Sequence, residues 1–402
     1  MNQHTILLGA GASADAGIPT ATQLLECVSE SKKRLKSAPH IDRAIDAALG
    51  GLRFAKPWDV VDVEVLYQTL VSLSDRREHF LAPFVGAWNE RVLDAERAPT
   101  SDAAEAMASA LATDLRISIE SAYRHGSISD SRLDHFRQAT QEALSSATGY
   151  IRTFRLAALH VLQVVAEKCW IAEGESDRAS YFRPLLQHAS VRPIWIATLN
   201  YDNTIELAAK DSEISVDRGV LDGSATVRFD SKSRVTLAKL HGSLDWSPTR
   251  NGAIAVEAHR NRTRALPALL FGAGNKLRIT GPYLDLLFAF REQLERSEEL
   301  HVCGYSFRDV HINYLIHSWL IADPSRQVII ADKSLSERTA KENYVRTIRE
   351  AVDEMIKPFQ TVHDPIERTT FLSAVERLTL VNTSAKDWAI GLPDRLIKKT
   401  AD

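Results

Sequence analysis

The feature that most constrains the fold of this chain is the glycine-rich segment LLGAGASADAGIPT at residues 7–20. Glycine loses much conformational freedom on folding, so it is usually kept where the backbone must approach another group closely. Residues 4–8, before the glycines, form a short run of mainly β-branched or apolar side chains, which predicts a buried parallel strand. From Asp15 the pattern becomes helical. A strand, a glycine turn and a helix open a Rossmann-like fold, whose first turn and helix N-terminus bind a pyrophosphate.

Three later segments repeat this arrangement of a buried strand followed by polar or glycine residues. The segment IWIATLNYDNTIE at 194–206 ends its strand before Asn200 and Asp202, and VTLAKLHGSLDW at 235–246 ends its strand before His241. LHVCGYSFRDVHINYLI at 300–316 follows the same pattern, and QVIIA at 327–331 leads to Asp332. Open α/β sheets bind ligands at the carboxyl ends of their strands, so these groups are candidate ligand contacts.

Each polar group also has a structural interpretation. Asn200 or Asp202 can cap the helix that follows, and Asp309 is a plausible cap of the next one. A lone histidine is usually structural, and the tripeptide His-Gly-Ser occurs twice, at 125–127 and at 241–243. His125 follows ISIESAYR, which looks helical, whereas His241 follows a strand and can enter a cleft. We therefore select His241 and treat His125 as a decoy.

Composition excludes several classes of function. The chain has 402 residues, enough for two to three domains or for one domain with a large insertion, and a net charge of −3, which gives no electrostatic case for nucleic-acid or membrane binding. No stretch is apolar and long enough to span a bilayer, and Asp15 interrupts the apolar start, so we expect a cytoplasmic protein without a signal peptide. The three cysteines, Cys27, Cys169 and Cys303, are too scattered for a disulfide framework or a zinc site.

The spacing of the first segment does not fit an ordinary dinucleotide fingerprint, because Gly17 comes too late to be its third glycine. Gly-Ala-Gly-Ala-Ser-x-x-x-Gly-Ile-Pro at 9–19 instead resembles the GAGxSxxxGIP signature of the sirtuin superfamily. Thr-x-Asn-x-Asp at 198–202, the His-Gly pair at 241–242 and Gly-x-Ser at 304–306 resemble further sirtuin motifs in the same order. The form GYSF-x-D is typical of the bacterial sirtuin-like branch.

The resemblance implies that the chain binds NAD and uses Asn200 and His241 as catalytic residues. It implies NAD contacts from Gly9, Ala10, Gly11, Ala12, Ser13, Gly17, Ile18, Pro19, Thr198, Asp202, Gly304, Tyr305, Ser306 and Asp332. It predicts an α/β fold with a Rossmann-like parallel sheet flanked by helices, formed by residues 1–30 and 190–335. A helical insertion is expected at 31–189, including 62–73 and 150–170. The end of the chain, 336–402, is expected to contain a helix at 335–357, and weaker strand or loop segments RLTLVN and DWAIGL.

The chain also departs from the family. Sirtuins hold zinc with two Cys-x-x-Cys pairs that help to frame the acyl-lysine peptide cleft, and this sequence has neither pair, so no zinc is expected. Thr20 and Ala21 stand where the family has an aromatic residue and an arginine. With no peptide cleft in evidence, water is the expected acceptor, which predicts an NAD hydrolase that releases nicotinamide and ADP-ribose.

Resemblance to zinc-less bacterial members implies a role in anti-phage defence through NAD depletion. A homo-oligomer is expected, with a partner in trans that triggers the activity, such as a HerA-like ATPase or, more distantly, an Argonaute-type protein. Two alternatives stay open at this point. One is an NAD-dependent protein deacylase or ADP-ribosyltransferase, and the other is a non-catalytic subunit that binds NAD or ADP-ribose and assembles a partner.

Overall fold

A computed structural model describes residues 4–31, 39–55, 61–75, 153–249, 252–256, 267, 269–271, 281–333, 336, 338–346 and 373–398. The chain divides into two units, one formed by residues 1–24 and 165–402 and the other by residues 25–164. His125 and its tripeptide, and Tyr150 of the predicted apolar helix face, lie outside the described residues.

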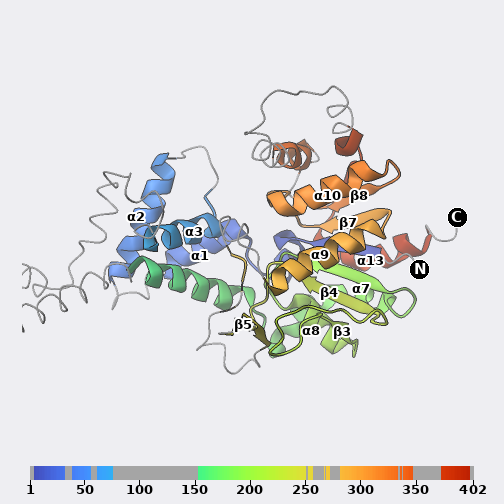
Figure 1. Ribbon diagram of the computed structural model, residues 1–402, viewed down its shortest axis with the longest axis horizontal. Helices are drawn as coiled ribbons and strands as arrows, with labels where there is room; N and C mark the ends of the chain where they lie inside the picture. Colours follow the sequence, from blue (N-terminus) through green and yellow to red (C-terminus); the bar gives the residue numbers. More distant parts are fainter. Residues whose placement is uncertain are drawn as a thin grey trace, which may run out of the picture. The chain divides into compact units, whose positions relative to one another are not determined.

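The first unit is built on a parallel sheet of seven strands in the order β3-β4-β2-β1-β7-β8-β9 (Figure 1). All six neighbouring pairs are parallel. The strands are β1 (His4–Leu8), β2 (Ile194–Thr198), β3 (Val216–Asp217), β4 (Val235–Lys239), β7 (Glu299–Cys303), β8 (Gln327–Ala331) and β9 (Leu378–Val381). The predicted strands before the four motifs are therefore confirmed.

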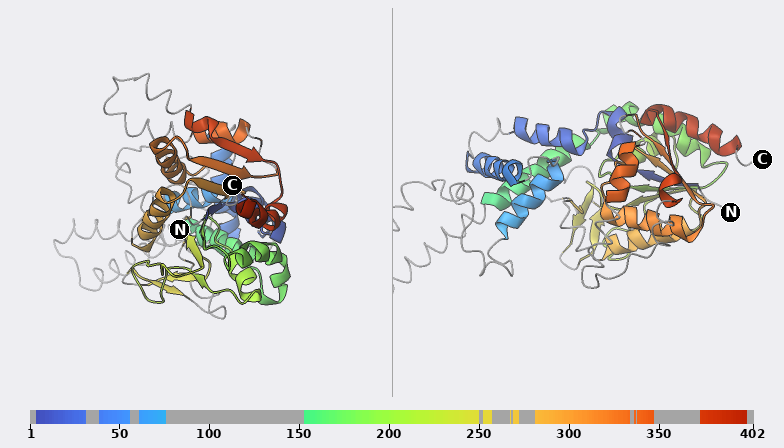
Figure 2. Two further views of the ribbon diagram at one scale, coloured as in Figure 1. Left: turned by 90° about the vertical axis from the view of Figure 1, so that its right-hand side faces the viewer. Right: turned by 90° about the horizontal axis from the view of Figure 1, so that it is seen from above.

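Helices cover both faces of this sheet, as expected for strands buried on both sides (Figure 2). On one face lie α9 (Pro282–Glu295) and α10 (Val310–Ala322), whose buried residues pack with Leu7, Trp195 and Val302. On the other face lie α7 (Arg183–His188), α8 (Thr204–Asp211) and α13 (Ala385–Lys398), with the 3-10 helix η4 (Glu173–Phe182). The α/β Rossmann-like fold predicted from the sequence is confirmed.

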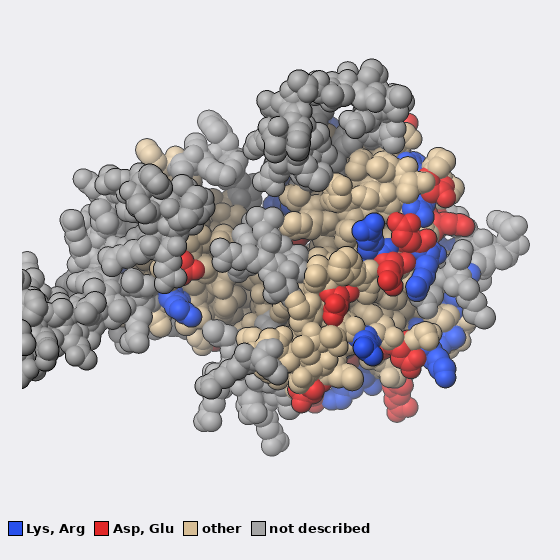
Figure 3. All heavy atoms as spheres, in the orientation of Figure 1, with Lys and Arg blue, Asp and Glu red and all other residues tan. Residues whose placement is uncertain are grey.

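The surface of this unit carries charges of both signs. On the face drawn in Figure 3, basic and acidic side chains of the described residues are interspersed rather than gathered by sign. No helix in the described segments is both long and apolar enough to cross a membrane.

The second unit is helical where it is described. It contains α2 (Pro39–Ala55), α3 (Val63–Ser74), most of α1 (Ala21–Ser31) and most of a helix at 153–169. Asp62 caps α3, because its Oδ1 accepts from the backbone N–H groups of Glu64 and Val65, each at 3.0 Å. The predicted helices at 62–73 and 150–170 are confirmed as far as the described residues extend.

Two local expectations need correction. The segment after the glycine turn forms a 3-10 helix, η1 (Ala10–Ala16), and the first α-helix begins only at Ala21. Gly17, with a φ of 74°, ends η1 in the left-handed conformation that favours glycine. The α-helix therefore cannot start at Asp15, because the chain reverses its backbone twist at Gly17 first.

The second correction concerns the end of the chain. RLTLVN supplies β9, the seventh strand, but DWAIGL is helical and belongs to α13. Ser384 caps its start: Ser384 Oγ accepts from the Asp387 N–H at 3.0 Å and donates to Asp387 Oδ2 at 2.7 Å. Trp388, Leu392 and Leu396 then recur every four residues and are all buried, so tertiary packing outweighs the helix-breaking tendency of the glycine and proline in α13.

Candidate functional site

The four motif segments and Asp332 follow the carboxyl ends of five adjacent strands. Leu8, the last residue of β1, pairs with Thr198 of β2 and with Cys303 of β7. Thr198 pairs in turn with Lys239 of β4, and Cys303 with Ala331 of β8. The strands therefore end in one row, and their turns meet at the sheet edge where ligands of open α/β sheets bind.

The glycines of the first and fourth motifs pack directly on each other. Gly304 has a φ of 64°, and a Cβ added there would lie 2.1 Å from the backbone nitrogen of Ala12. A Cβ on Gly9 would lie 2.6 Å from the Gly304 oxygen, and one on Gly11 would lie 2.8 Å from the Gly304 Cα. The Gly11 N–H donates to the Gly304 oxygen at 2.9 Å, and the Ala12 N–H donates to the Gly9 oxygen at 2.9 Å. In this structure the glycines thus allow two turns to approach closely, and these two amide donors already have acceptors.

Two residues from η4 hold the carbonyl side of the first turn. The Tyr181 hydroxyl donates to the Ala12 oxygen at 2.7 Å, and Arg178 Nε donates to the Ala16 oxygen at 2.8 Å. Burial, with Asp202 and Asp15 nearby, raises the pKa of Tyr181 far above its ordinary value, so the phenol stays protonated and donates. No local pattern points to either residue, because they lie more than 160 positions from the turn that they support.

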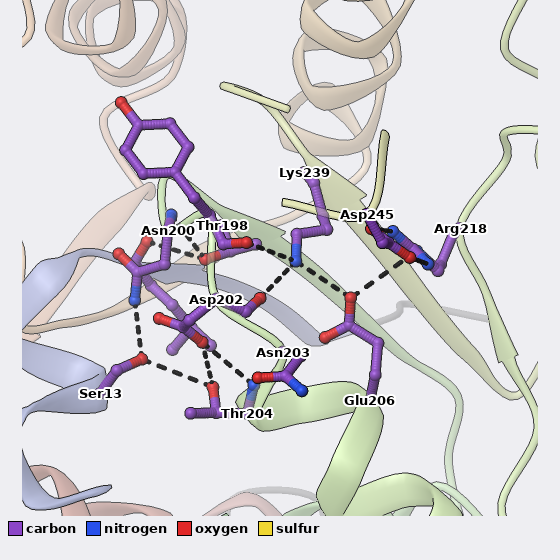
Figure 4. A network of polar contacts seen from close by, with 12 residues as sticks. Ser13, Thr198, Asn200, Asp202, Asn203, Thr204, Glu206, Arg218, Lys239 and Asp245 are labelled. Carbon is purple, nitrogen blue, oxygen red and sulfur yellow. Dashed lines mark hydrogen bonds and ion pairs between the residues drawn. The ribbon is translucent and has the colours of Figure 1, made fainter. Parts of the chain in front are cut away.

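Asn200 joins the second motif to the first. Its Nδ2 donates to the Gly9 oxygen at 2.8 Å and to Ser13 Oγ at 3.0 Å (Figure 4). Thr198 Oγ1 accepts from the Asn200 N–H at 3.1 Å, which fixes the loop at the end of β2. The side chain of Asn200 therefore does not cap α8. Both of its amide hydrogens are used within the protein, which leaves Oδ1 as the side-chain atom that can accept from a ligand.

Asp202 binds the first residue of α8, although the N-cap position itself is occupied by Asn203, which makes no side-chain cap hydrogen bond. Its Oδ1 accepts from the backbone N–H of Thr204 at 3.1 Å and from Thr204 Oγ1 at 2.7 Å. Thr204 Oγ1 lies 3.4 Å from Ser13 Oγ, so the first and second motifs share one buried network of hydroxyl, amide and carboxylate groups.

A buried lysine from β4, which no sequence pattern singled out, binds the backbone of the same loop. Lys239, the last residue of β4, has a side chain that is 1% exposed. Its Nζ donates to the backbone oxygens of Tyr201 and Asp202 and lies 3.0 Å from Glu206 Oε1 (Figure 4). Lysine is rarely buried without an ionic partner, and Glu206 in the first turn of α8 provides that partner.

A second ion pair continues this network. Arg218 binds Asp245 through two parallel hydrogen bonds of 2.7 and 2.8 Å, and its Nε lies 3.7 Å from Glu206 Oε1. Burial alone would raise the pKa of the Asp245 carboxyl, but the Arg218 hydrogen bonds and charge overcome this and hold that pKa far below its ordinary value. The four side chains carry two charges of each sign, so the buried cluster is neutral.

His241 leaves the end of β4 and meets an acidic side chain from another element. Its Nε2 lies 3.2 Å from Asp309 Oδ2, and the two side chains are 8% and 5% exposed. Asp309 is also the N-cap of α10, as the sequence predicted, because its Oδ1 accepts from the N–H groups of His311 and Ile312. The pairing with His241 was missed, since nothing local links two residues that are 68 positions apart.

The remaining predicted contacts have varied surroundings. The Tyr305 hydroxyl is buried and donates to Asn313 Oδ1 at 2.7 Å, which gives this residue a structural role in the turn. The Ser306 backbone oxygen accepts from Asn343 Nδ2 at 2.9 Å.

Asp332 lies directly after β8 and is partly exposed. Burial, together with the nearby Asp332 carboxylate, raises the pKa of the Cys303 thiol. Gly17 is exposed, Ile18 is buried and Pro19 is partly buried.

Among the described residues there is no group of three or more histidine, cysteine, aspartate or glutamate side chains arranged to hold a metal ion. Comparison with curated proteins gives no match. A family model described as SIR2-like domain matches residues 195–352, a range that contains Asn200, His241 and the turn at 304–306. This match supports a place for the chain in the sirtuin-like superfamily, whose SIR2-like domains use NAD.

Proposed function

We propose that this chain is an NAD glycohydrolase that cleaves the bond between nicotinamide and ribose. The observation that carries the proposal is the 3.0 Å hydrogen bond from Asn200 Nδ2 to Ser13 Oγ, which joins two motif turns at the ligand-binding edge of the sheet. His241 follows β4, which pairs with β2, the strand that precedes Asn200. The similarity to SIR2-like domains supports NAD as the compound bound at this edge.

The chemistry needs few groups from the protein. The bond from the ribose carbon to the nicotinamide nitrogen breaks with its electron pair going to nicotinamide, and the sugar passes through an oxocarbenium-like transition state. Water then adds to the same carbon and loses a proton, which gives ADP-ribose, nicotinamide and one proton. Asn200 Oδ1 is the atom that can orient a ribose hydroxyl or the attacking water, and the His241 ring can accept the proton from that water.

Water, rather than an acylated peptide, is the acceptor that the sequence favours. A four-cysteine zinc module frames the peptide cleft in the sirtuins that this chain resembles, and three scattered cysteines do not form one. The two-stranded sheet of β5 (Trp246–Pro248) and β6 (Ile254–Val256) follows the His241 turn instead. A deacylase would therefore need a peptide site built from other elements.

The proposed setting is bacterial anti-phage defence, in which NAD depletion stops a phage infection. The support is the segment GYSFRD at 304–309, which resembles the zinc-less bacterial branch. An enzyme that consumes NAD must be inactive in an uninfected cell, so we propose a homo-oligomer that a partner in trans, such as a HerA-like ATPase, activates.

The test is a time course of NAD loss and nicotinamide release by the purified full-length chain without any acceptor. Wild type and His125→Ala are expected to consume NAD, whereas His241→Ala and Asn200→Ala are expected to lose at least about 100-fold in rate. His125→Ala is the matched control, since it changes the same His-Gly-Ser tripeptide at the other position. The assay is repeated with a co-expressed HerA-like ATPase, because the activity is proposed to need a trigger.

Absence of turnover by wild type in both forms of the assay contradicts the proposal. If NAD binds in that case, the non-catalytic alternative is the better description. Release of nicotinamide that appears only when an acylated peptide is added identifies a deacylase instead.

A further inference from the structure

We propose that Asp309 positions His241 and selects its tautomer, so that Nδ1 is the nitrogen that accepts the proton from water. The kinetic consequence of this inference rests on the proposed function. The geometry that supports the inference is independent of that function. The two oxygens of the Asp309 carboxylate face different groups. Oδ1 accepts from the backbone N–H groups of His311 and Ile312, at 3.1 and 3.2 Å, while Oδ2 lies 3.2 Å from His241 Nε2.

The backbone that carries the Asp309 carboxylate is tied into the turn by further hydrogen bonds. The Tyr305 hydroxyl accepts from the Asp309 N–H at 3.2 Å, and Tyr305 is itself bound to Asn313 Oδ1 at 2.7 Å. Asn313 Nδ2 donates to the Phe307 oxygen at 2.9 Å, which closes the turn between β7 and α10. The turn that carries the GYSFRD segment therefore directs Oδ2 toward the histidine.

The chemistry of the two groups decides where the histidine proton lies. A carboxylate only accepts hydrogen bonds. The 3.2 Å contact between Oδ2 and Nε2 is an ion-pair distance that is not aligned as a hydrogen bond here, and the nitrogen facing the carboxylate is the one expected to carry the hydrogen. With a hydrogen on Nε2, the neutral ring keeps its lone pair on Nδ1. Once Nδ1 accepts a proton, the ring becomes a cation that faces the carboxylate of Asp309, and the opposite charges attract.

The other groups around the ring do not compete for this role. From the loop after β2, the Tyr201 ring lies 6.4 Å from the His241 ring between centroids and contributes no charge. Lys239, at the end of β4, is engaged with Glu206, and Asp245, just before β5, is engaged with Arg218. The carboxylate at the N-cap of α10 is thus the charged group that lies within hydrogen-bond distance of the ring in the described part of the site.

The decisive variant is Asp309→Asn, because it separates the two roles of one side chain. Asparagine caps helices about as well as aspartate, so its Oδ1 keeps the bonds to the start of α10. The opposite atom becomes an amide that donates to Nε2, so the hydrogen of the neutral ring must move to Nδ1. We expect kcat for NAD hydrolysis to fall by about 100-fold to 10,000-fold, with KM changed less than about two-fold.

The matched control makes the same change at a cap without a candidate catalytic histidine. Asp62 caps α3 with the same two-bond geometry, and Asp62→Asn is expected to leave kcat and KM unchanged. Asp309→Ser, which retains a good cap but no carboxylate, is expected to lose kcat like Asp309→Asn. Asp62→Asn and Asp309→Ser together show whether a loss of activity in Asp309→Asn comes from a weakened cap or from the missing charge.

A second measurement does not depend on turnover. Ring nitrogen-15 NMR of the histidine-labelled full chain, with the His241 signals assigned by their loss in His241→Gln, is expected to show hydrogen on Nε2 in wild type and on Nδ1 in Asp309→Asn. If wild type has no NAD hydrolase activity, the proposed function fails and the ring spectrum alone decides the inference. An unchanged tautomer, or a kcat of Asp309→Asn within about three-fold of wild type, overturns it.

Discussion

Replacing Lys239 by methionine tests whether the loop that carries Asn200 depends on a buried charge. Methionine has a similar length and keeps the apolar contacts, but it removes the cation from Glu206 and the donor from the Tyr201 and Asp202 oxygens. Removing one partner of a buried ion pair usually costs about 3–5 kcal/mol. The Glu206 side chain is 22% exposed and still has the Arg218 guanidinium 3.7 Å from its Oε1 after the lysine is removed. We therefore expect Lys239→Met to lower the free energy of unfolding by about 3 kcal/mol, the lower end of that range.

The assay is urea unfolding of wild type, Lys239→Met, Glu206→Gln and the double variant, followed in the transition of the unit that contains the sheet. The double variant is expected to be less destabilised than the sum of the two single variants by about 1–3 kcal/mol, since it no longer leaves an unpaired charge. Lys210→Met is the matched control. Lys210 lies 2.9 Å from Glu173, almost the same distance, but the two side chains are 61% and 67% exposed, so its loss should cost under about 1 kcal/mol.

A loss below about 1 kcal/mol for Lys239→Met, or single effects that add to within about 0.5 kcal/mol, would refute this reasoning. The first result would mean that water or another group satisfies the loop carbonyls and Glu206 without the lysine. The second would mean that Lys239 and Glu206 stabilise the fold independently of each other.

Two further predictions concern the pH dependence and the packing of the turns. Burial lowers the pKa of His317 to about 4, so between pH 6.5 and 4 the unfolded chain binds a proton that the folded chain does not. The free energy of unfolding should therefore fall by up to about 2 kcal/mol as the pH is lowered through that range, after allowance for the partial exposure of the ring. Urea unfolding at several pH values should show that this contribution is missing in His317→Gln. Gly304→Ala should prevent soluble folding or cost at least about 3 kcal/mol, because its Cβ would meet the Ala12 backbone nitrogen at 2.1 Å. Gly391→Ala, in α13 with nothing within 4 Å of the new Cβ, should raise the melting temperature slightly, and a destabilisation as large as that of Gly304→Ala would contradict the packing argument.

The sheet was predictable because its signals are local. Five-residue apolar runs such as His4–Leu8 and Gln327–Ala331 specify buried strands with their observed bounds, and the glycines after them mark where the chain must turn. The same local character explains the failures. η1 and α13 were misjudged because a left-handed Gly17 and a glycine and proline inside a helix are decided by what the segment packs against.

For the candidate site, the sequence by itself determined which side chains follow strand ends, and so which ones gather at one edge of the sheet. The apolar runs that mark the strands, together with the parallel sheet expected for this fold class, are enough for that conclusion. Only the tertiary structure decided which of them contact each other: Asn200 with Ser13, Lys239 with Glu206, and His241 with Asp309. These partners lie 33 to 187 positions apart, and a hydrogen bond or ion pair depends on a few ångströms of separation that no local pattern encodes.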